Sequence, residues 1–204
     1  MAIVGAVRAG LTWAYYIATM GYAPTVCERE EKPGGMMAYG IPAYKLPRDV
    51  VEAEIDILRE LGVEIRCGVD VGKDVTLESL RDEGFKAFYL AIGAQGNRPL
   101  GVEGEDAQGV SGELSFLRET IEADVVGNAC DVADEVVVVG GGNVAVDAAC
   151  MALRSGAKNV TMVSIEQREE MPASPDEIEE ALADGVKIEC GWGPAKINAD
   201  ANGQ

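Results

Sequence analysis

The feature that most constrains this chain is a run of four valines followed by three glycines, in the stretch VVVVGGGNVAVDAA. A β-branched run predicts a buried parallel strand, and glycines directly after it permit a tight turn into a helix. Residues 140–145 fit the pattern G-x-G-x-x-A, in which the second glycine lets a pyrophosphate approach the backbone. The amides that begin the helix can hold phosphate. A dinucleotide-binding turn is therefore predicted here, and a glycine-rich turn without a ligand is the alternative.

A second copy of this pattern lies at the start of the chain, in AIVGAVRAGL. Gly5 and Gly10 fill the outer positions, but Val7 takes the place of the middle glycine. Glu28 follows the next predicted strand, where an acid accepts hydrogen bonds from a ribose hydroxyl, and Gly34 and Gly35 offer a further close approach of backbone to a cofactor. The alternatives are a turn that has lost its ligand, a solvated acid at Glu28 and a plain turn at the two glycines.

Strands and helices alternate along the chain, which predicts an α/β fold with parallel sheets. In particular, a capping box at Asp49 and Glu52 is expected to begin a helix, and Thr76 another. The run KAFYLAIGA, apolar on both faces, predicts a central strand. The expected strands are 2–6, 24–27, 63–69, 86–94, 135–139, 160–165 and 186–192, and the expected helices are 8–20, 49–61, a short one from 76, 111–120, 143–155 and 174–184.

The repeat of the strand–turn–helix opening predicts two domains rather than one large sheet. The pattern weakens from about Ser111 to Asp134, and we place the boundary near residues 122 to 133. We therefore expect two Rossmann-like, three-layer nucleotide-binding domains, over residues 1–128 and 129–204.

Charge and composition exclude several classes of function. The chain has 17 basic and 35 acidic residues and a net charge of -18, so a nucleic acid backbone would be repelled. It has no histidine, which excludes Ser-His-Asp and Cys-His catalysis within this sequence and removes the commonest zinc ligand. No metal site and no catalytic side chain is predicted, and the chemistry is expected to come from a bound cofactor.

The five cysteines contain no C-x-x-C pair, which argues against a redox dithiol and a disulfide framework. We expect reduced, mostly buried thiols in a cytoplasmic protein. The apolar runs are interrupted by glycines and by polar residues such as Asp147, so no membrane span is predicted.

Several further stretches make a family resemblance specific, namely EREEKPGGMMAYGIPAYKLP, LGVEIRCGVDVGKDVTLESL, YLAIGAQGNRPLGVEGED and REEMPAS. With the second glycine turn, they resemble the small (β) subunit of glutamate synthase and its relatives, over nearly the whole chain. These are oxidoreductases of the wider pyridine-nucleotide-disulfide reductase fold. The resemblance implies FAD at the first turn, NAD(P)H in an inserted second domain, and electrons passed on to iron–sulfur clusters or a large catalytic partner subunit.

The resemblance also implies roles for single residues. In the first domain, Gly5, Ala6, Ala9 and Gly10 match the pyrophosphate turn, Glu28 matches the ribose acid, and Gly35 and Met36 match the loop along the flavin. Val71 matches a position where backbone meets adenine, and Ala91 and Gly93 match the turn that closes over the cofactor. In the second domain, Gly141, Gly142, Asn143, Val144 and Asp147 match the nicotinamide-nucleotide site, and Gly140 is the first glycine of the turn pattern. For Asp147 the alternative is an ordinary helix acid.

This sequence departs from the family pattern at both sites. Val7 and Arg8 replace glycine and proline in the first turn, and Ala38 and Ala43 stand where arginine and glutamate are usual. A decayed FAD site is therefore the alternative to a working one.

In the second domain, Ile165 and Glu166 stand where many members carry two arginines that bind the 2′-phosphate of NADP. An acid repels that phosphate and accepts from a 2′-hydroxyl, so NADH is favoured over NADPH. Arg168 could still reach a phosphate, or form a surface salt bridge.

The sequence thus favours an NAD(P)H-dependent flavoprotein oxidoreductase subunit. The alternative is a non-catalytic nucleotide-binding module. Against the family pattern, the second half of the NAD(P) domain and the returning part of the FAD domain are missing, so we expect a piece of a longer enzyme.

Overall fold

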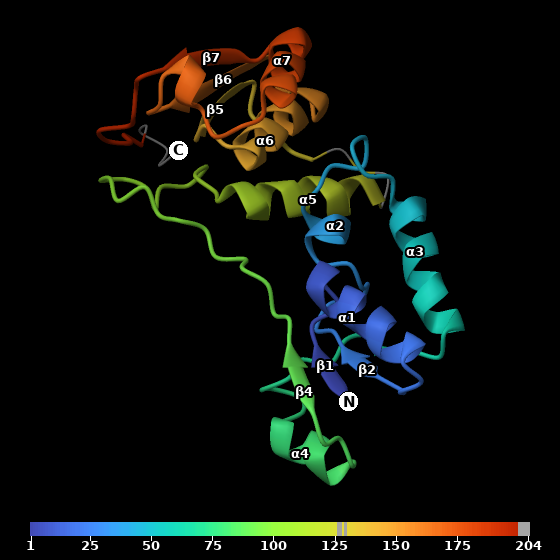
Figure 1. Ribbon diagram of the computed structural model, residues 1–204. Coiled ribbons are helices and arrows are strands. Elements are labelled where there is room, and N and C mark those ends of the chain that lie inside the picture. The colour runs from blue at the N-terminus through green and yellow to red at the C-terminus, as the bar shows by residue number, and fades with distance from the viewer. Residues whose placement is uncertain (126–127, 129, 200–204) are drawn as a thin grey trace. The chain divides into compact units, whose positions relative to one another are not determined.

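The computed structural model describes residues 1–125, 128 and 130–199. The chain forms two compact units, Met1–Gln95 and a second that begins at Gly96, and each is a mixture of helices and parallel strands (Figure 1). The predicted boundary between residues 128 and 129 falls where residues 126, 127 and 129 lie outside the described part of the chain. The assignment of FAD to residues 1–128 and of NAD(P)H to residues 129–204 stays a prediction.

The first unit contains a parallel sheet with the strand order β3-β2-β1-β4. Its strands and helices are β1 (Ala2–Val4), α1 (Arg8–Thr19), β2 (Thr25–Cys27), α2 (Met36–Tyr39), α3 (Arg48–Glu60), β3 (Glu64–Arg66), α4 (Leu77–Asp82) and β4 (Phe88–Leu90). Ile3 is in register with Val26 on one side and with Tyr89 on the other. All four strands therefore end at the same edge, where the first glycine turn lies.

Both faces of this sheet are covered by packed side chains. Alternate side chains of a strand point to opposite faces, so the strands contribute to two separate clusters. Ile3 and Val26 belong to a buried cluster with Leu11 of α1 and Ile55 of α3. Ala2 and Cys27 instead join a cluster with Leu80 of α4. The unit therefore has three layers, as the sequence predicts. Tyr89 of β4 packs against the first of these clusters, and the ring of Trp13 on α1 stacks on it, with centroids 5.3 Å apart.

Helix α3 begins differently from the prediction. It starts at Arg48, with Pro47 as the N-cap and no side-chain capping bond, so the predicted capping box of Asp49 and Glu52 is wrong. The guanidinium of Arg48 donates to backbone carbonyls of the preceding loop, those of Met37 and Ile41, which anchors the helix start there. By contrast, Thr76 caps α4 as predicted, in a reciprocal box with Ser79.

Strand β4 is not the central strand that its apolar sequence predicts. Among the described residues it pairs with β1 alone, so it lies at the edge of the sheet, and Leu90 is 61% exposed. The apolar run identified a strand correctly, but hydropathy alone does not report how many neighbours the strand has.

The second unit has a parallel sheet with the order β5-β6-β7. Its elements are α5 (Glu113–Val125), β5 (Glu135–Val139), α6 (Asn143–Arg154), β6 (Asn159–Ser164), a 3-10 turn (Arg168–Glu170), α7 (Pro175–Asp184) and β7 (Lys187–Cys190). Val138 and Met162 of the sheet share one core with α6, with Leu117 of α5 and with Ile178 of α7. This packing sets the start of α6 at the carboxyl ends of β5 and β6.

The five cysteines are free, but only Cys27 and Cys150 are buried and the others are partly exposed. Burial raises the pKa of the Cys27 thiol above its ordinary value, and the same cause raises the pKa of Cys67 and Cys130. In the described part of the chain, no helix combines the length and the apolar character needed to cross a membrane.

Candidate nucleotide-binding sites

The second glycine turn joins β5 to α6 and leaves room for a ligand. Gly140 has a φ of +153°, and a Cβ placed on it would lie 3.1 Å from the Cβ of Ala145, so the outer positions need small residues. A Cβ placed on Gly142 would meet no atom of the described residues within 4 Å. Gly142 is also the N-cap of α6 and provides no side-chain cap. A phosphate can therefore approach the backbone at Gly142 and the amides of the first helical turn.

The segment that contains REEMPAS holds this turn in place. The amide of Ser174 donates to Oδ1 of Asn143 over 2.8 Å, and the amide of Ala173 donates to the carbonyl of Gly141 over 2.9 Å. Val144 stays partly exposed, and Asp147 lies one turn into α6 with its Oδ1 shielded from solvent. The predicted residues of this site thus come together around the start of α6.

Glu166 lies beside the same turn. The hydroxyl of Ser164 donates to its Oε2 over 2.6 Å, and its own amide donates to the Ser164 hydroxyl over 3.2 Å. The hydrogen bond from Ser164 lowers the pKa of Glu166, so the carboxylate stays ionised. A Cβ on Gly141 would lie 3.0 Å from that Oε2. Arg168 begins the 3-10 turn two residues later and is partly exposed.

A further acid lies at this turn that the sequence does not predict. Glu113 is in the first turn of α5, and its Oε1 would lie 2.9 Å from a Cβ placed on Gly140. Its side chain is half-buried, and burial raises its pKa above the ordinary carboxyl value. The sequence carries no signal for this contact, because an acid in a first helical turn is common on electrostatic grounds alone.

The first glycine turn joins β1 to α1, and both outer glycines are required by sterics. A Cβ on Gly5, whose φ is +102°, would collide with the carbonyl oxygen of Ala91 after β4. A Cβ on Gly10 would collide with the carbonyl oxygen of Gly5. Helix α1 therefore lies close to the strand ends, as a helix does after a dinucleotide-binding turn.

The middle position of the first turn differs from its counterpart in the second. Val7 is the N-cap of α1, and its Cγ1 would lie 2.6 Å from a Cβ placed on Gly35. The neighbouring amide of Gly34 donates to the carbonyl of Ala6 over 2.7 Å, which joins the two loops. The space that stays open at Gly142 is thus occupied here by a valine side chain.

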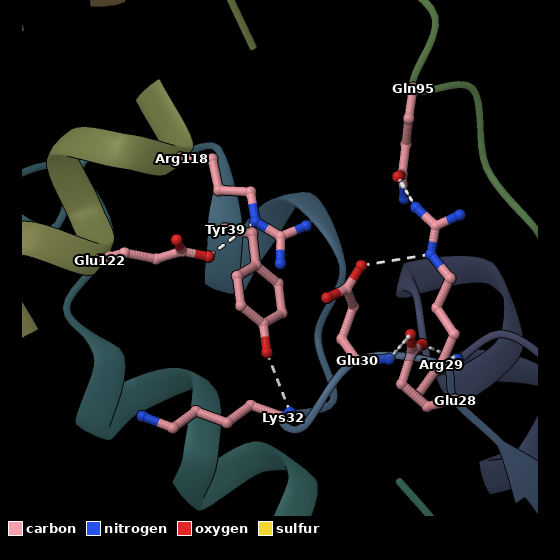
Figure 2. Close-up of polar contacts among 9 residues, drawn as sticks. Glu28, Arg29, Glu30, Lys32, Tyr39, Gln95, Arg118 and Glu122 are labelled. Atoms are coloured by element: carbon pink, nitrogen blue, oxygen red, sulfur yellow. Dashed lines mark hydrogen bonds and ion pairs between the residues drawn. The ribbon is translucent and has the colours of Figure 1, made fainter. Parts of the chain in front are cut away.

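Glu28 is not a solvated acid, since only 5% of its surface is exposed. Its Oε2 accepts from the amide of Ala6 over 2.7 Å and its Oε1 from the amide of Glu30 over 3.0 Å. Figure 2 shows the next residue, Arg29, reaching both Glu30 and Gln95. The carboxylate of Glu28 is therefore fixed at the first turn, at the end of β2, where a ribose acid belongs.

The other predicted residues of the first site lie around the same edge of the sheet or in the loops that follow it. Ala91 is buried and its amide donates to the carbonyl of Val4 over 2.7 Å. Val71 pairs with Val75 in an isolated bridge, and Gly93 has a φ of +71°. The remaining two, Ala9 and Met36, lie in the first turn of α1 and at the start of α2.

Comparison with known proteins agrees with this arrangement. The chain is 43% identical to the NADPH-Fe(3+) oxidoreductase subunit beta of Geobacter sulfurreducens, over all of this chain and 30% of that protein. It is 34% identical to the glutamate synthase [NADPH] small chain of Escherichia coli, over all of this chain and 44% of the relative. The chain therefore spans less than half the length of these relatives.

Among solved structures, FprA from Mycobacterium tuberculosis in complex with NADPH has the same fold, with a TM-score of 0.73. The two share 23% sequence identity, and the match covers 90% of this chain and 46% of FprA. The family model for the pyridine nucleotide-disulphide oxidoreductases matches residues 1–203. The chain, with its two glycine turns at the ends of parallel strands, belongs to this family.

Proposed function

We propose that this chain is part of an NAD(P)H-dependent flavoprotein oxidoreductase, with FAD at the first glycine turn and NAD(P)H at the second. The observation that carries the proposal is the repeated geometry. In each unit a parallel strand leads through a glycine turn into a helix, and an acid, Glu28 or Glu166, follows the next strand beside that turn. Hydride transfer between nicotinamide and flavin requires a site for each cofactor, and the flavin supplies the redox chemistry when it is bound.

The first turn fits FAD at all but one position. Gly5 and Gly10 permit the close approach of α1, and Glu28 is fixed beside Ala6, where it can accept from a ribose hydroxyl. We assign Ala6, Ala9, Gly34, Gly35, Met36, Val71, Ala91 and Gly93 to the same site, within a FAD domain over residues 1–128. Val7 is the position that does not match the cofactor.

The second turn fits a nicotinamide dinucleotide, and residues 129–204 are assigned to this domain. Gly140, Gly141, Gly142, Asn143, Val144 and Asp147 surround the position of the pyrophosphate. We propose that NADH is preferred, because the ionised Glu166 lies beside Gly141 and would repel a 2′-phosphate. Both relatives described above carry NADPH in their names, so Arg168 is the residue to examine if NADPH proves to be the better substrate.

Electrons from the flavin are proposed to leave for iron–sulfur clusters or for a partner subunit, as in a glutamate synthase small chain. The names of the two relatives describe them as a subunit and a small chain, and each is more than twice as long as this chain. The five free cysteines support a cytoplasmic location, where thiols stay reduced.

The proposal is tested by the colour and redox behaviour of the purified full-length protein. We expect a bound yellow flavin whose absorbance bleaches when NADH is added without oxygen, and NADH oxidation with an artificial electron acceptor. A colourless protein that takes up no FAD and oxidises no NADH would contradict the proposal.

A specific observation favours a second candidate, a nucleotide-binding module without catalytic activity. The contact of Val7 with Gly35 fills the position that the second turn leaves open. If this contact excludes FAD, the protein binds NAD(P) alone. Separate titrations with FAD and with NADH distinguish the two candidates, because nucleotide binding without flavin binding supports the second.

A further inference from the structure

Two carboxylates reach the second glycine turn from different elements. Glu166 follows β6 and lies against Gly141, whereas Glu113 belongs to α5, which packs on α6, and lies against Gly140. The acid after the second strand is the one that contacts the adenosine ribose in this class of site. If a dinucleotide binds with its adenosine beside Glu166 and its pyrophosphate at Gly142, the second carboxylate of the turn, Glu113, is left for the nicotinamide half.

The environment of the Glu113 carboxylate favours the addition of a hydrogen-bond donor from a ligand. Its side chain is half-buried, and within the described ranges no hydrogen bond or salt bridge engages its carboxylate. Burial of a charged group without a partner is unfavourable, so a donor from a ligand would relieve it. A pyrophosphate has no donor to offer, whereas the nicotinamide nucleoside has ribose hydroxyls and a carboxamide NH₂.

We propose that Glu113 is a binding residue of the nucleotide site, which accepts a hydrogen bond from the nicotinamide nucleoside of the dinucleotide. This inference rests on the proposed function, since it assumes that the second turn holds NADH. It assigns the two acids of the turn to the two ends of the ligand, Glu166 to the adenosine half and Glu113 to the nicotinamide half.

Titration with whole and truncated ligands tests this assignment. NADH and ADP share the adenosine half, but ADP lacks the nicotinamide nucleoside. We expect Glu113→Ala, in the full-length protein with saturating FAD, to weaken NADH binding roughly tenfold, the loss typical of one hydrogen bond to a charged group, and to leave ADP binding unchanged. Glu113→Gln keeps an acceptor oxygen and should lie between the two. Glu119→Ala, at an exposed position on the same helix, is the matched control and should change neither affinity.

The outcomes separate this inference from the proposed function. Equal weakening of NADH and ADP by Glu113→Ala would show a structural effect on the turn, and unchanged NADH binding would show no contact. Either result overturns the inference while flavin reduction by NADH still stands. A wild-type protein that binds no NADH overturns both.

Discussion

The side chain of Val7 packs against the backbone of Gly35, so that a Cβ on that glycine would lie 2.6 Å from Cγ1 of the valine. The contact joins the first glycine turn to the loop after β2, at the place where the proposed FAD pyrophosphate would pass. The same position in the second turn is Gly142, where a Cβ would lie more than 4 Å from the other described residues that the turn brings near. The two turns thus differ in how much of the phosphate position the protein itself fills.

Replacing Val7 by glycine should therefore tighten FAD binding. We expect a gain of roughly tenfold, which corresponds to about 1.4 kcal/mol, because the ligand no longer displaces a packed side chain. Equilibrium titration of the apoprotein, followed by quenching of flavin fluorescence, measures the change. Val7→Ala should give an intermediate affinity. Equal affinities in all three proteins would mean that the valine does not obstruct the flavin.

The open face of Gly142 can be tested with a matched pair of glycines. Neither Gly142 nor Gly96 has a positive φ, and in the part of the chain that the structure describes, a Cβ on either would meet no atom within 4 Å. We expect both alanine variants to keep the melting temperature within a few degrees of the wild type. Only Gly142→Ala should weaken NADH binding, roughly tenfold or more, since its methyl group stands where the pyrophosphate approaches. Comparable binding by the two variants would argue against a nucleotide at this turn.

Glu166→Gln should shift the choice between the two nicotinamide nucleotides. The substitution removes the negative charge beside Gly141 but keeps a group that can bond to Ser164. We expect NADPH binding to improve about tenfold relative to NADH, because the 2′-phosphate no longer meets a carboxylate. The ratio of the two dissociation constants measures the effect, with the exposed Glu169→Gln as the control. An unchanged ratio would place the 2′ position of the ribose away from Glu166.

Glu113→Gln should stabilise the protein without nucleotide at neutral pH. Burial raises the pKa of Glu113 in the folded state, so its charged form opposes folding and the wild type loses stability as pH rises through the carboxyl range. The variant should have the higher melting temperature at pH 7, and the difference should shrink as the pH is lowered below the ordinary carboxyl pKa. Glu119→Gln serves as the control on the same helix. A lower melting temperature for Glu113→Gln at pH 7 would contradict this account.

The sequence predicted most of the helices and strands and both glycine turns, because few other structures fit a strand that ends in glycines and leads into a helix. Its errors have physical causes. The start of α3 depends on the anchoring of Arg48 by carbonyls of the preceding loop, which a local capping pattern does not contain. The edge position of β4 depends on strand order rather than on hydropathy.

Within the candidate sites, the sequence predicted the residues whose role depends on the conformation of the backbone. It did not predict contacts between side chains and glycines that lie far apart in the sequence. Gly5 and Gly10 can be predicted from their spacing in the turn pattern, although the carbonyl oxygen that excludes a Cβ at Gly5 belongs to the distant Ala91. The approach of Glu113 to Gly140 depends on how α5 packs on α6, and no periodicity encodes it. The contact of Val7 with Gly35 likewise needed the path of the loop after β2.

The stacking of Trp13 on Tyr89 gives the molecule an internal optical reporter. The chain has two tryptophans, and the other, Trp192, belongs to the second unit, is 68% exposed and donates its amide to the carbonyl of Ser164 beside the Glu166 carboxylate. Each unit therefore carries one indole in a distinct environment. With single Trp→Phe variants, the emission of the remaining indole separates flavin uptake in one unit from nucleotide uptake in the other.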